Sequence, residues 1–343
     1  MVNEIVIWAH SECRSNAALY AEVKRLAEAR GLRVTMCLWD VRPMDESRKA
    51  HRIEYARVGD DIEKGRAILA AHCGAGTVHV FCVYQNSAAW RQLAIEAKRG
   101  GARVVISAEA PCEMCVGAKA LAKRFYYRFV LPRRVRAVVR SADMFLNASG
   151  MSGIGRLLRI GWAKEKIVPF GYASDVNVLF SREAREIRGN VLNILHTGVE
   201  ERYRDFETLE RALEILRERG VRFELKHTEG KVPQEELAKL YDWADVFVGC
   251  GLCEPWGMRV NDAIHSGVPV VVSSGMGARW LVEQFGCGAV FNKGDAKELS
   301  DILERIANDV DYFKRLRSGV SAAHIAWTPA ARAQEWLRAV LGM

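Results

Sequence analysis

Two acidic side chains lie on either side of a predicted helix start near residue 257. Glu254 and Asp262 are eight positions apart, and Pro255 and Gly257 stand between them. Pro and Gly interrupt the chain after an apolar run, and the residues from Met258 onward carry apolar side chains at helical spacing. The sequence therefore predicts a helix that begins near Gly257, with Glu254 just before it and Asp262 about one to two turns inside it.

The start of such a helix can bind an anion. Its first backbone amides have no partner within the helix, and the helix dipole adds to their positive potential. A diphosphate could bind there, since Gly257 would let it come close to the main chain. Glu254 and Asp262 are better suited to accept hydrogen bonds from sugar hydroxyls than to touch a phosphate. The alternative is that Glu254 caps the helix and Asp262 faces solvent.

These residues resemble the retaining glycosyltransferases of family 4, which have the two-domain GT-B fold and carry two Glu separated by seven residues. Asp262 stands at the second position here and is one methylene shorter. Residues 266–270 are similar to the family's small-Gly-x-Pro-Val turn, and residues 274–277 follow where the family has a Gly-rich loop. The resemblance implies that Glu254 binds the hexose and Asp262 the ribose of a nucleoside-diphosphate sugar. The expected donor site also includes Trp256, Gly257 and Met258.

A second stretch is expected to bind the phosphates of the same donor. Gly198 follows the first predicted strand of the second half, so its loop should open at the carboxyl ends of the strands. The family places an Arg directly after this Gly and a Lys six positions after it, where this chain has Val199 and Arg204. Arg204 is predicted to neutralise the departing diphosphate, with Arg202 compensating for the missing Arg. Alternatively, both arginines pair with carboxylates of their own loop.

His227 ends the next predicted strand, where it is expected either to approach the donor nucleotide or to cap the strand. Acceptor residues are expected in the first half of the chain. Glu109 follows a predicted strand at a point where family members present a polar catalytic residue, so it is a candidate to bind an acceptor or donor-sugar hydroxyl; a loop carboxylate without a role is the alternative. The loop after the first strand offers His10, Ser11 and Arg14, and it lacks the family's pair of glycines. Glu254, Arg204 and Glu109 are the catalytic candidates.

Strands and helices are predicted to alternate along the chain, which favours an α/β fold with parallel sheets. Expected strands are 5–8, 33–38, 78–83, 104–107, 144–147, 191–196, 221–226, 246–249, 268–272 and 289–291. Expected helices are 16–30, 88–99, 206–219, 234–242, 278–285 and 329–341, with more than one helix over 296–320. We expect an acceptor-binding Rossmann-like domain over residues 1–172 and a donor-binding one over 173–322, facing a central cleft. The resemblance implies that a terminal helix within 323–343 crosses back to the first domain.

The charge of the chain is concentrated in its first half. Residues 1–172 hold 28 Lys or Arg against 16 Asp or Glu, whereas residues 173–343 hold 22 against 26. Residues 118–140 alone carry eight basic residues, four aromatics and no carboxylate, which suits an anionic membrane surface. The residues expected to face the membrane are Lys119, Lys123, Arg124, Arg128, Arg133 and Arg134. The alternative is a solvated helix packed on its domain through Leu121, Phe125, Phe129 and Leu131. Nucleic acid is not an expected partner, because no recognised binding motif accompanies the patch.

Composition limits the class of protein. There is no run of about 18 apolar residues, and the first residues lead straight into a predicted strand, so neither a spanning helix nor a signal peptide is expected. Nine cysteines at irregular spacings favour reduced thiols in the cytoplasm. The Cys-x-x-Cys pairs 112/115 and 250/253 lie in different predicted domains, so we expect unligated thiols and no metal.

Together these features predict a retaining glycosyltransferase that needs no cofactor beyond its nucleoside-diphosphate sugar. The family's habits imply a lipid-linked glycan acceptor, a role in surface polysaccharide assembly such as lipopolysaccharide or capsule, and a position at the inner face of the cytoplasmic membrane. Two alternatives stay open. A nucleotide-sugar epimerase shares the GT-B architecture, and a binding module that has lost transfer would fit the changes at Val199 and Asp262.

Overall fold

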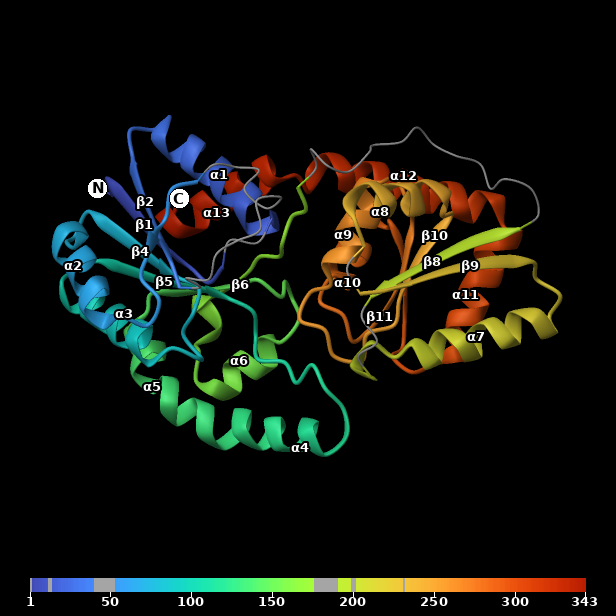
Figure 1. The fold of residues 1–343 in the computed structure, drawn as a ribbon, viewed down its shortest axis with the longest axis horizontal. Coiled ribbons are helices and arrows are strands. Elements are labelled where there is room, and N and C mark those ends of the chain that lie inside the picture. Colours follow the sequence, from blue (N-terminus) through green and yellow to red (C-terminus); the bar gives the residue numbers. More distant parts are fainter. Residues whose placement is uncertain (1, 12–13, 40–52, 176–190, 199–201, 231) are drawn as a thin grey trace. The chain divides into compact units, whose positions relative to one another are not determined.

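The computed structural model describes residues 2–11, 14–39, 53–175, 191–198, 202–230 and 232–343. The chain divides into two compact units, each built on a parallel sheet with helices against it (Figure 1). The first unit comprises Met1–Pro111, Ala122–Ala173 and Pro329–Met343, and the second comprises Cys112–Leu121 and Ser174–Thr328. The predicted fold class, two parallel-sheet α/β domains, is confirmed. The expected domain bounds stay a prediction; the compact units differ from them most in the segment Cys112–Leu121, which packs with the second unit.

The described part of the first unit contains a seven-stranded sheet in the order β3-β2-β1-β4-β5-β6-β7, parallel throughout. Its strands are β1 Glu4–Ala9, β2 Arg33–Leu38, β3 Ala56–Arg57, β4 Thr77–Phe81, β5 Arg103–Ala108, β6 Met144–Asn147 and β7 Ile167–Pro169. Its helices are α1 Arg14–Glu28, α2 Ile62–His72, α3 Ala88–Arg99, α5 Leu131–Ser141, α6 Ile154–Ile160 and α13 Pro329–Leu341, while α4 Gly117–Phe125 starts in the second unit. Strand β1, between β2 and β4, is buried along its whole length, and all its residues after Glu4 are apolar.

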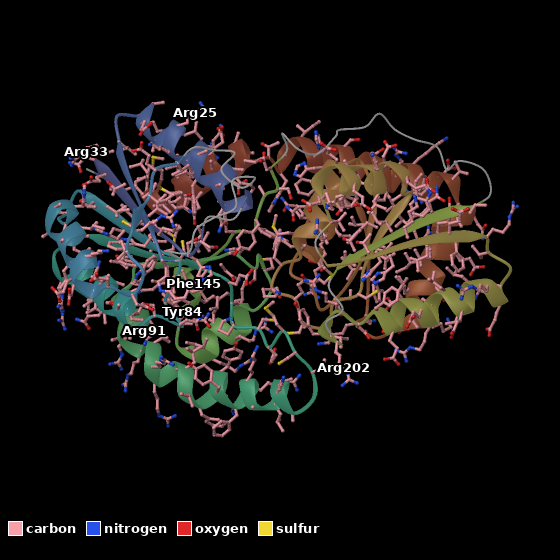
Figure 2. The ribbon with its side chains drawn as sticks, in the orientation of Figure 1. Arg25, Arg33, Tyr84, Arg91, Phe145 and Arg202 are labelled. Carbon is pink, nitrogen blue, oxygen red and sulfur yellow. The ribbon has the colours of Figure 1, made fainter. Side chains whose placement is uncertain are left out.

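The two faces of this sheet carry separate cores. Tyr84 and Phe145, both labelled in Figure 2, meet edge to face at 5.7 Å between ring centroids on one face. On the other face, α13 packs against α1 and buries Trp336, Leu337 and Val340 together with residues of β1 and β4. The last helix of the chain therefore belongs to the first unit, as the resemblance implied.

Trp336→Ala is expected to lower the free energy of unfolding of the first unit by about 3–5 kcal/mol, because the indole is fully buried and its removal leaves a cavity. Chemical denaturation followed by circular dichroism measures this change. Gln334→Ala on the exposed face of the same helix is the matched control and should change stability by no more than about 0.5 kcal/mol. A loss below about 1 kcal/mol in the Trp336 variant would contradict the packing described for α13.

The described part of the second unit contains a five-stranded parallel sheet in the order β12-β11-β10-β8-β9. Its strands are β8 Leu192–Gly198, β9 Phe223–Glu229, β10 Val246–Gly249, β11 Val270–Ser273 and β12 Gly288–Phe291. Its helices are α7 Phe206–Glu218, α8 Gln234–Trp243, α9 Met258–His265, α10 Arg279–Phe285, α11 Ala296–Asn308 and α12 Val310–Ala326. The order of the strands reverses between β8 and β10, so the carboxyl ends of these two strands flank a topological switch point.

More than one helix is expected over 296–320, and the structure places the division at Asp309. This residue has an extended conformation and separates α11 from α12. Its side chain accepts a hydrogen bond from the Tyr312 amide at 2.8 Å, which caps the second helix. The helices α2 and α6 are not among the predicted elements, and α4 and α5 lie in the basic stretch 118–140, for which a helix is the stated alternative. Among the described residues, no helix combines the length and apolar character needed to cross a bilayer.

Candidate functional site

The candidate site of the second unit is built where three neighbouring strands end. Gly198 ends β8, Gly249 ends β10 and Ser273 ends β11. The loop from 250 to 257 follows β10 and is held on both sides by backbone hydrogen bonds. The Leu252 amide donates to the Tyr203 carbonyl oxygen at 2.7 Å, and the Glu254 amide donates to the Gly275 carbonyl oxygen at 3.0 Å.

The Gly-rich loop at 274–277 supports the loop that carries Glu254. The Gly277 amide donates to the Glu254 carbonyl oxygen at 3.1 Å, and Glu254 and Met276 form a parallel β-bridge. A Cβ on Gly277 would lie 1.9 Å from the Pro255 carbonyl oxygen, so any larger residue would push the two loops apart. The glycines that sequence resemblance singled out therefore have a local structural role, which is to fix the backbone of Glu254.

The Glu254 carboxylate faces the guanidinium group of Arg204. Glu254 Oε1 lies 4.0 Å from Arg204 Nη2, and both side chains are mostly buried, at 16% and 24% exposed. Arg204 itself lies over the end of β8, since a Cβ on Gly198 would be 3.0 Å from its Nη1. Two side chains that lie 50 positions apart in the sequence thus meet at the switch point, one after β8 and one after β10.

Helix α9 begins beside Glu254. Its N-cap, Gly257, has φ +107° and ψ +71°, and no side chain caps the helix there. A Cβ on Gly257 would lie 2.6 Å from Met276 Cε and 3.7 Å from the Glu254 carboxyl carbon. This position therefore requires glycine for its backbone conformation and for its space. The predicted helix start is confirmed within a residue. The N-terminus of the helix, which no side chain caps, lies beside the Glu254 carboxylate.

Asp262 lies on the same helix and already has polar neighbours. Its Oδ1 accepts a hydrogen bond from Ser174 Oγ at 2.7 Å, and its Oδ2 lies 3.4 Å from Arg259 Nη1. Its side chain is 18% exposed, which does not fit the alternative of a solvent-facing carboxylate. Met258, in the first turn of α9, is partly exposed.

The Trp256 side chain is buried in the core of the second unit rather than presented to a ligand. Its indole nitrogen donates to Asn261 Oδ1 at 2.7 Å, and its ring stacks on Trp327 with 6.2 Å between centroids. A donor contact by Trp256 stays a prediction. Its position next to Glu254 in the sequence does not fix the direction of its side chain, because neighbours along a turn point in different directions.

The other arginine of the predicted phosphate site, Arg202, differs from Arg204 in its surroundings. It is exposed and projects outward, as Figure 2 shows. It lines a hollow of about 570 Å³ that is formed by Val116, Gly117, Arg202, Asp205, Phe206, Glu207, Glu210 and Leu252. Val199, where the family carries an Arg, lies outside the described residues, as do Glu200 and Glu201 of the predicted ion pairs.

His227 belongs to an aromatic stack at the same end of the sheet. Its ring lies 4.2 Å from Phe206 and 5.2 Å from His196, measured between ring centroids, with the planes 24° and 23° apart. His196 Nδ1 lies 2.8 Å from the Val248 carbonyl oxygen, and burial lowers the pKa of His196 to about 4. His196 is therefore neutral near pH 7, and the stack offers flat rings beside the end of β8.

The residues expected to bind the acceptor lie at one edge of the first unit's sheet. His10 and Ser11 follow β1, and Glu109 follows β5, with only β4 between these strands. The exposed His10 stacks on Trp39 at 5.0 Å between ring centroids, and the half-buried Glu109 accepts a hydrogen bond at its backbone oxygen from Gln85 Nε2 at 3.3 Å. The side chain of Arg14 lies outside the described residues. The acceptor role of these residues stays a prediction.

The basic stretch at 118–140 forms helix α4, the π-helix Tyr126–Val130 and helix α5, and both α helices are labelled in Figure 1. The alternative that Leu121, Phe125, Phe129 and Leu131 pack it onto the domain holds only for Leu131, which is fully buried. The basic residues expected at a membrane are all exposed: Lys119, Lys123, Arg124, Arg128, Arg133 and Arg134. Phe125, Phe129 and Val130 are 62%, 43% and 42% exposed and line a hollow with Arg133 and Arg134.

One grouping was not foreseen from the sequence. Cys112 and Cys253 were assigned to different predicted domains, but the segment that carries Cys112 packs with the second unit, and the two thiols meet there beside Glu113. The spacing of the two Cys-x-x-Cys pairs gave no sign of this contact. Cys250, the partner of Cys253 in its pair, is instead buried in the core.

The fold is GT-B, and it is shared across the whole chain with structures of several enzymes. HepE of Anabaena in complex with UDP and glucose is 14% identical, with a TM-score of 0.67 and 100% of each chain covered. The lipopolysaccharide outer core galactosyltransferase WaaB is 11% identical, with a TM-score of 0.67 and 99% of each chain covered. A candidate UDP-N-acetylglucosamine 2-epimerase from Listeria monocytogenes is 11% identical, with a TM-score of 0.60, and covers 99% of this chain and 96% of its own.

Residues 207–320 match the family model for glycosyl transferases group 1, which is about one third of the chain. The matched stretch contains His227, Glu254, Gly257 and Asp262 and ends before α13. The comparison with curated proteins gave no match. The family match thus falls on the unit that carries the Glu254 loop, and the structural similarity covers both units.

Proposed function

We propose that this protein is a retaining glycosyltransferase that moves a sugar from a nucleoside-diphosphate sugar to a hydroxyl group. The observation that carries the proposal is the apposition of Glu254, Arg204 and the uncapped start of α9 at the switch point of a sheet. A carboxylate, a guanidinium and a helix N-terminus together match the parts of a sugar diphosphate, which are hydroxyl groups and an anion. The family match over residues 207–320 supports the same class of reaction.

In the proposed reaction, the bond between the anomeric carbon and the diphosphate oxygen breaks as the acceptor oxygen attacks. Negative charge grows on the departing diphosphate, and Arg204 with the first amides of α9 stabilises it. Glu254 holds the donor sugar through its hydroxyl groups, and Asp262 binds the ribose. The nucleotide is assigned to the stack of His196, His227 and Phe206, which lies at the carboxyl ends of β8 and β9. The resemblance to family 4 favours attack on the same face, assisted by the donor phosphate, with retention at the anomeric carbon.

Acceptor recognition is assigned to the first unit, through His10, Ser11, Arg14 and Glu109. Gly198 and Arg202 complete the proposed donor site. We further propose that the acceptor is a lipid-linked glycan made at the inner face of the cytoplasmic membrane. The exposed basic and aromatic residues of α4 and α5 support this part of the proposal, and the similarity to the fold of WaaB is consistent with it.

The primary test is donor binding followed by product analysis. Thermal unfolding should be measured with a panel of nucleotide sugars, starting with UDP sugars because HepE is described with UDP-glucose. A bound donor should raise the unfolding midpoint in proportion to its affinity. The donor found in this way should then release its nucleotide only when an acceptor hydroxyl is present, and NMR of the product should show the donor's anomeric configuration. Inversion would refute the retaining mechanism, and no stabilisation by any sugar nucleotide would refute the donor site.

An epimerase is the second candidate, favoured by the similarity to the Listeria structure. Such an enzyme would convert a nucleotide sugar without any acceptor. Incubating the stabilising donor alone and analysing it by chromatography separates the two functions. A new sugar nucleotide would support the epimerase, whereas an unchanged donor that reacts only with an acceptor supports the transferase. Binding without reaction in either assay would indicate a module that has lost transfer.

The membrane proposal makes a separate prediction. The double variant Arg124→Ala/Arg128→Ala should bind vesicles of anionic lipid about tenfold or more weakly, since each basic residue near such a surface contributes about 1 kcal/mol. Co-sedimentation with phosphatidylglycerol vesicles at low salt measures this. Arg30→Ala/Arg99→Ala removes two exposed arginines elsewhere on the first unit and should leave binding nearly unchanged. Equal losses in both double variants would indicate a response to net charge alone and would contradict the proposed face.

A further inference from the structure

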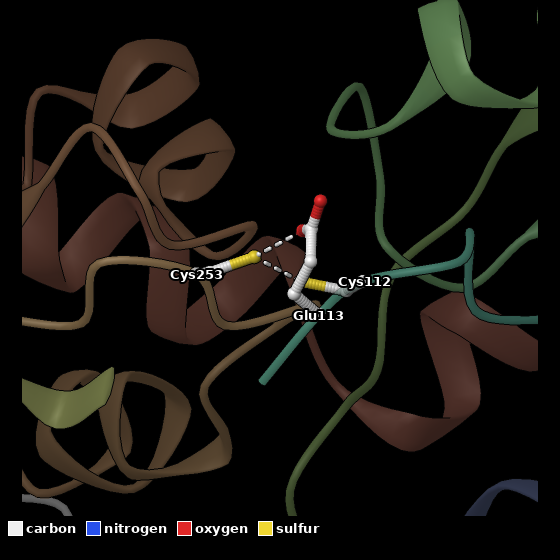
Figure 3. Close-up of side chains that lie close together, drawn as sticks. All are labelled: Cys112, Glu113 and Cys253. Atoms are coloured by element: carbon white, nitrogen blue, oxygen red, sulfur yellow. Dashed lines mark hydrogen bonds between the residues drawn. The ribbon is translucent and has the colours of Figure 1, made fainter. Parts of the chain in front are cut away.

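Two cysteines that lie far apart in the sequence meet in the second unit. Cys112 and Glu113 follow β5 in the chain, and Cys253 directly precedes Glu254. The two Sγ atoms are 2.7 Å apart, and Cys253 Sγ lies 3.0 Å from Glu113 Oε2, as Figure 3 shows. The Sγ atoms of both cysteines and a carboxylate oxygen of Glu113 all lie within 4.8 Å of one another, close enough for the three side chains to hold a metal ion.

The surroundings of this pair differ from those of the other buried thiols. Burial raises the pKa of Cys37 and of Cys287 to about 12, which keeps both protonated and unreactive. The pKa of Cys253 is lowered to about 7, mainly because the neighbouring Cys112 donates a hydrogen bond to its sulfur. Cys253 is also partly exposed, whereas Cys112 is 7% exposed. One thiol is therefore reachable and partly ionised, and the other lies directly behind it.

We propose that Cys112 and Cys253 form a reversible disulfide bond, with a low-molecular-weight disulfide such as oxidised glutathione as the oxidant. The Cys253 thiolate attacks one sulfur of the oxidant, and one glutathione leaves with the bonding electron pair. The Cys112 thiol then loses its proton and attacks the Cys253 sulfur of the mixed disulfide, which releases the second glutathione. Two protein thiols are oxidised and one small disulfide is reduced to two thiols, so atoms and electrons balance.

The geometry favours a disulfide over a metal site. Two thiolates bound to one zinc ion at about 2.3 Å in tetrahedral geometry stand about 3.8 Å apart, so the two sulfurs would have to separate. A disulfide needs them to approach from 2.7 Å to about 2.05 Å, a smaller change. Glu113 would be the only further ligand in this group of three, which leaves a tetrahedral site short of one protein ligand. Its carboxylate is instead placed to accept a proton from a thiol.

The bond would also act on the loop that carries Glu254. The two neighbours of Cys253 in the chain are held by backbone hydrogen bonds. The Leu252 amide donates to Tyr203, and the amide and carbonyl groups of Glu254 bond to the Gly-rich loop. A disulfide from Cys253 to Cys112 would tie this loop covalently to the segment that precedes α4. If the proposed transferase function holds, oxidation should slow turnover, because it restrains the backbone that positions Glu254. The disulfide itself does not depend on that function.

The full-length protein can be tested directly. It is equilibrated in glutathione buffers of increasing oxidised fraction, quenched with N-ethylmaleimide and digested, and the peptides are identified by mass spectrometry. A cross-linked peptide containing Cys112 and Cys253 is expected under oxidising buffer, with reversal by dithiothreitol. It should be absent from Cys112→Ser and Cys253→Ser and retained in Cys115→Ser, the matched control. Wild-type protein alkylated at both cysteines in the most oxidising buffer would overturn the proposal.

Two further measurements make the result unambiguous. Oxidised wild-type protein should unfold several degrees higher than the reduced form, because the bond closes a loop of some 140 residues, and Cys112→Ser should show no such shift. Purified protein that retains one equivalent of zinc, lost in Cys112→Ser, would overturn the disulfide in favour of a metal site. If the cross-link forms but no donor sugar binds in either redox state, the disulfide stands and the proposed transferase function fails.

Discussion

Glu254→Gln should lower kcat/KM for sugar transfer by about 100- to 1000-fold while the protein stays folded, a loss typical of removing one preorganised charged group from a reacting centre. Glutamine keeps the size of the side chain but replaces the carboxylate by a neutral amide. The carboxylate is mostly buried and stands 4.0 Å from the Arg204 guanidinium. A neutral amide accepts weaker hydrogen bonds from sugar hydroxyl groups than a carboxylate does, and it leaves the positive charge of Arg204 without its negative partner. Initial rates with the donor found by thermal shift, together with the unfolding midpoint, measure both effects.

Glu283→Gln is the matched control for this variant. Glu283 lies on α10 of the same unit and pairs on the surface with Arg279 at 3.5 Å, so its loss should leave transfer unchanged. Full activity of Glu254→Gln would exclude Glu254 as a catalytic residue, whatever the fate of the rest of the site. Equal losses in both variants would instead point to a general effect on the second unit.

The alternation of elements could be predicted because parallel sheets leave a strong local signal. Strands buried on both faces are short apolar runs, as in residues 5–9 of β1 and in Val246–Gly249, and helix α7 has one apolar face. Asp309 shows the limit of this signal. The sequence predicts more than one helix over 296–320, but the residue at which they divide becomes clear only in the structure, where Asp309 is extended and caps α12.

The meeting of Glu254 with Arg204 could be anticipated, because each follows a strand and strand ends meet along one edge of a parallel sheet. The direction of single side chains could not. Trp256 turns into the core because its indole finds Asn261 and Trp327, and Asp262 turns toward Ser174. Such orientations depend on which residues surround a position in space, and a sequence lists only neighbours along the chain.

The contact between Cys112 and Cys253 lay beyond sequence reasoning for a different reason. The predicted domain boundaries lie near residues 172 and 322 and leave residues 1–172 undivided, whereas the short segment Cys112–Leu121 packs with the second unit. The amino-acid composition of this short segment does not differ from that of its neighbours, so no local sequence pattern shows that it packs with the other unit. Long-range packing of this kind becomes visible only when the chain is seen folded.

Arg204→Ala should reduce kcat for transfer by about 100-fold or more and weaken binding of the free nucleoside diphosphate, because it removes the permanent positive charge beside α9. The variant also leaves the Glu254 carboxylate without its neighbouring cation, so part of the fall in kcat comes from the altered surroundings of Glu254. Steady-state kinetics and nucleotide titration by calorimetry separate the effect on turnover from the effect on binding. Arg204→Lys keeps the positive charge but loses the planar guanidinium group with its two parallel N–H donors. It should be substantially more active than Arg204→Ala, since related enzymes are expected to use Lys in this role.

The matched control is Arg217→Ala on α7. Arg217 lies over the Phe223 ring, with its guanidinium carbon 5.1 Å from the ring centroid, and it takes no part in the proposed site. Its loss should leave kcat and nucleotide affinity within about twofold of wild type, as for most surface substitutions. If Arg204→Lys is as inactive as Arg204→Ala, the charge alone does not suffice, and bidentate contact of the guanidinium with the diphosphate becomes the basis of catalysis. If Arg204→Ala retains full activity, the leaving diphosphate must be stabilised by α9 without this arginine, and the role proposed for Arg204 is wrong.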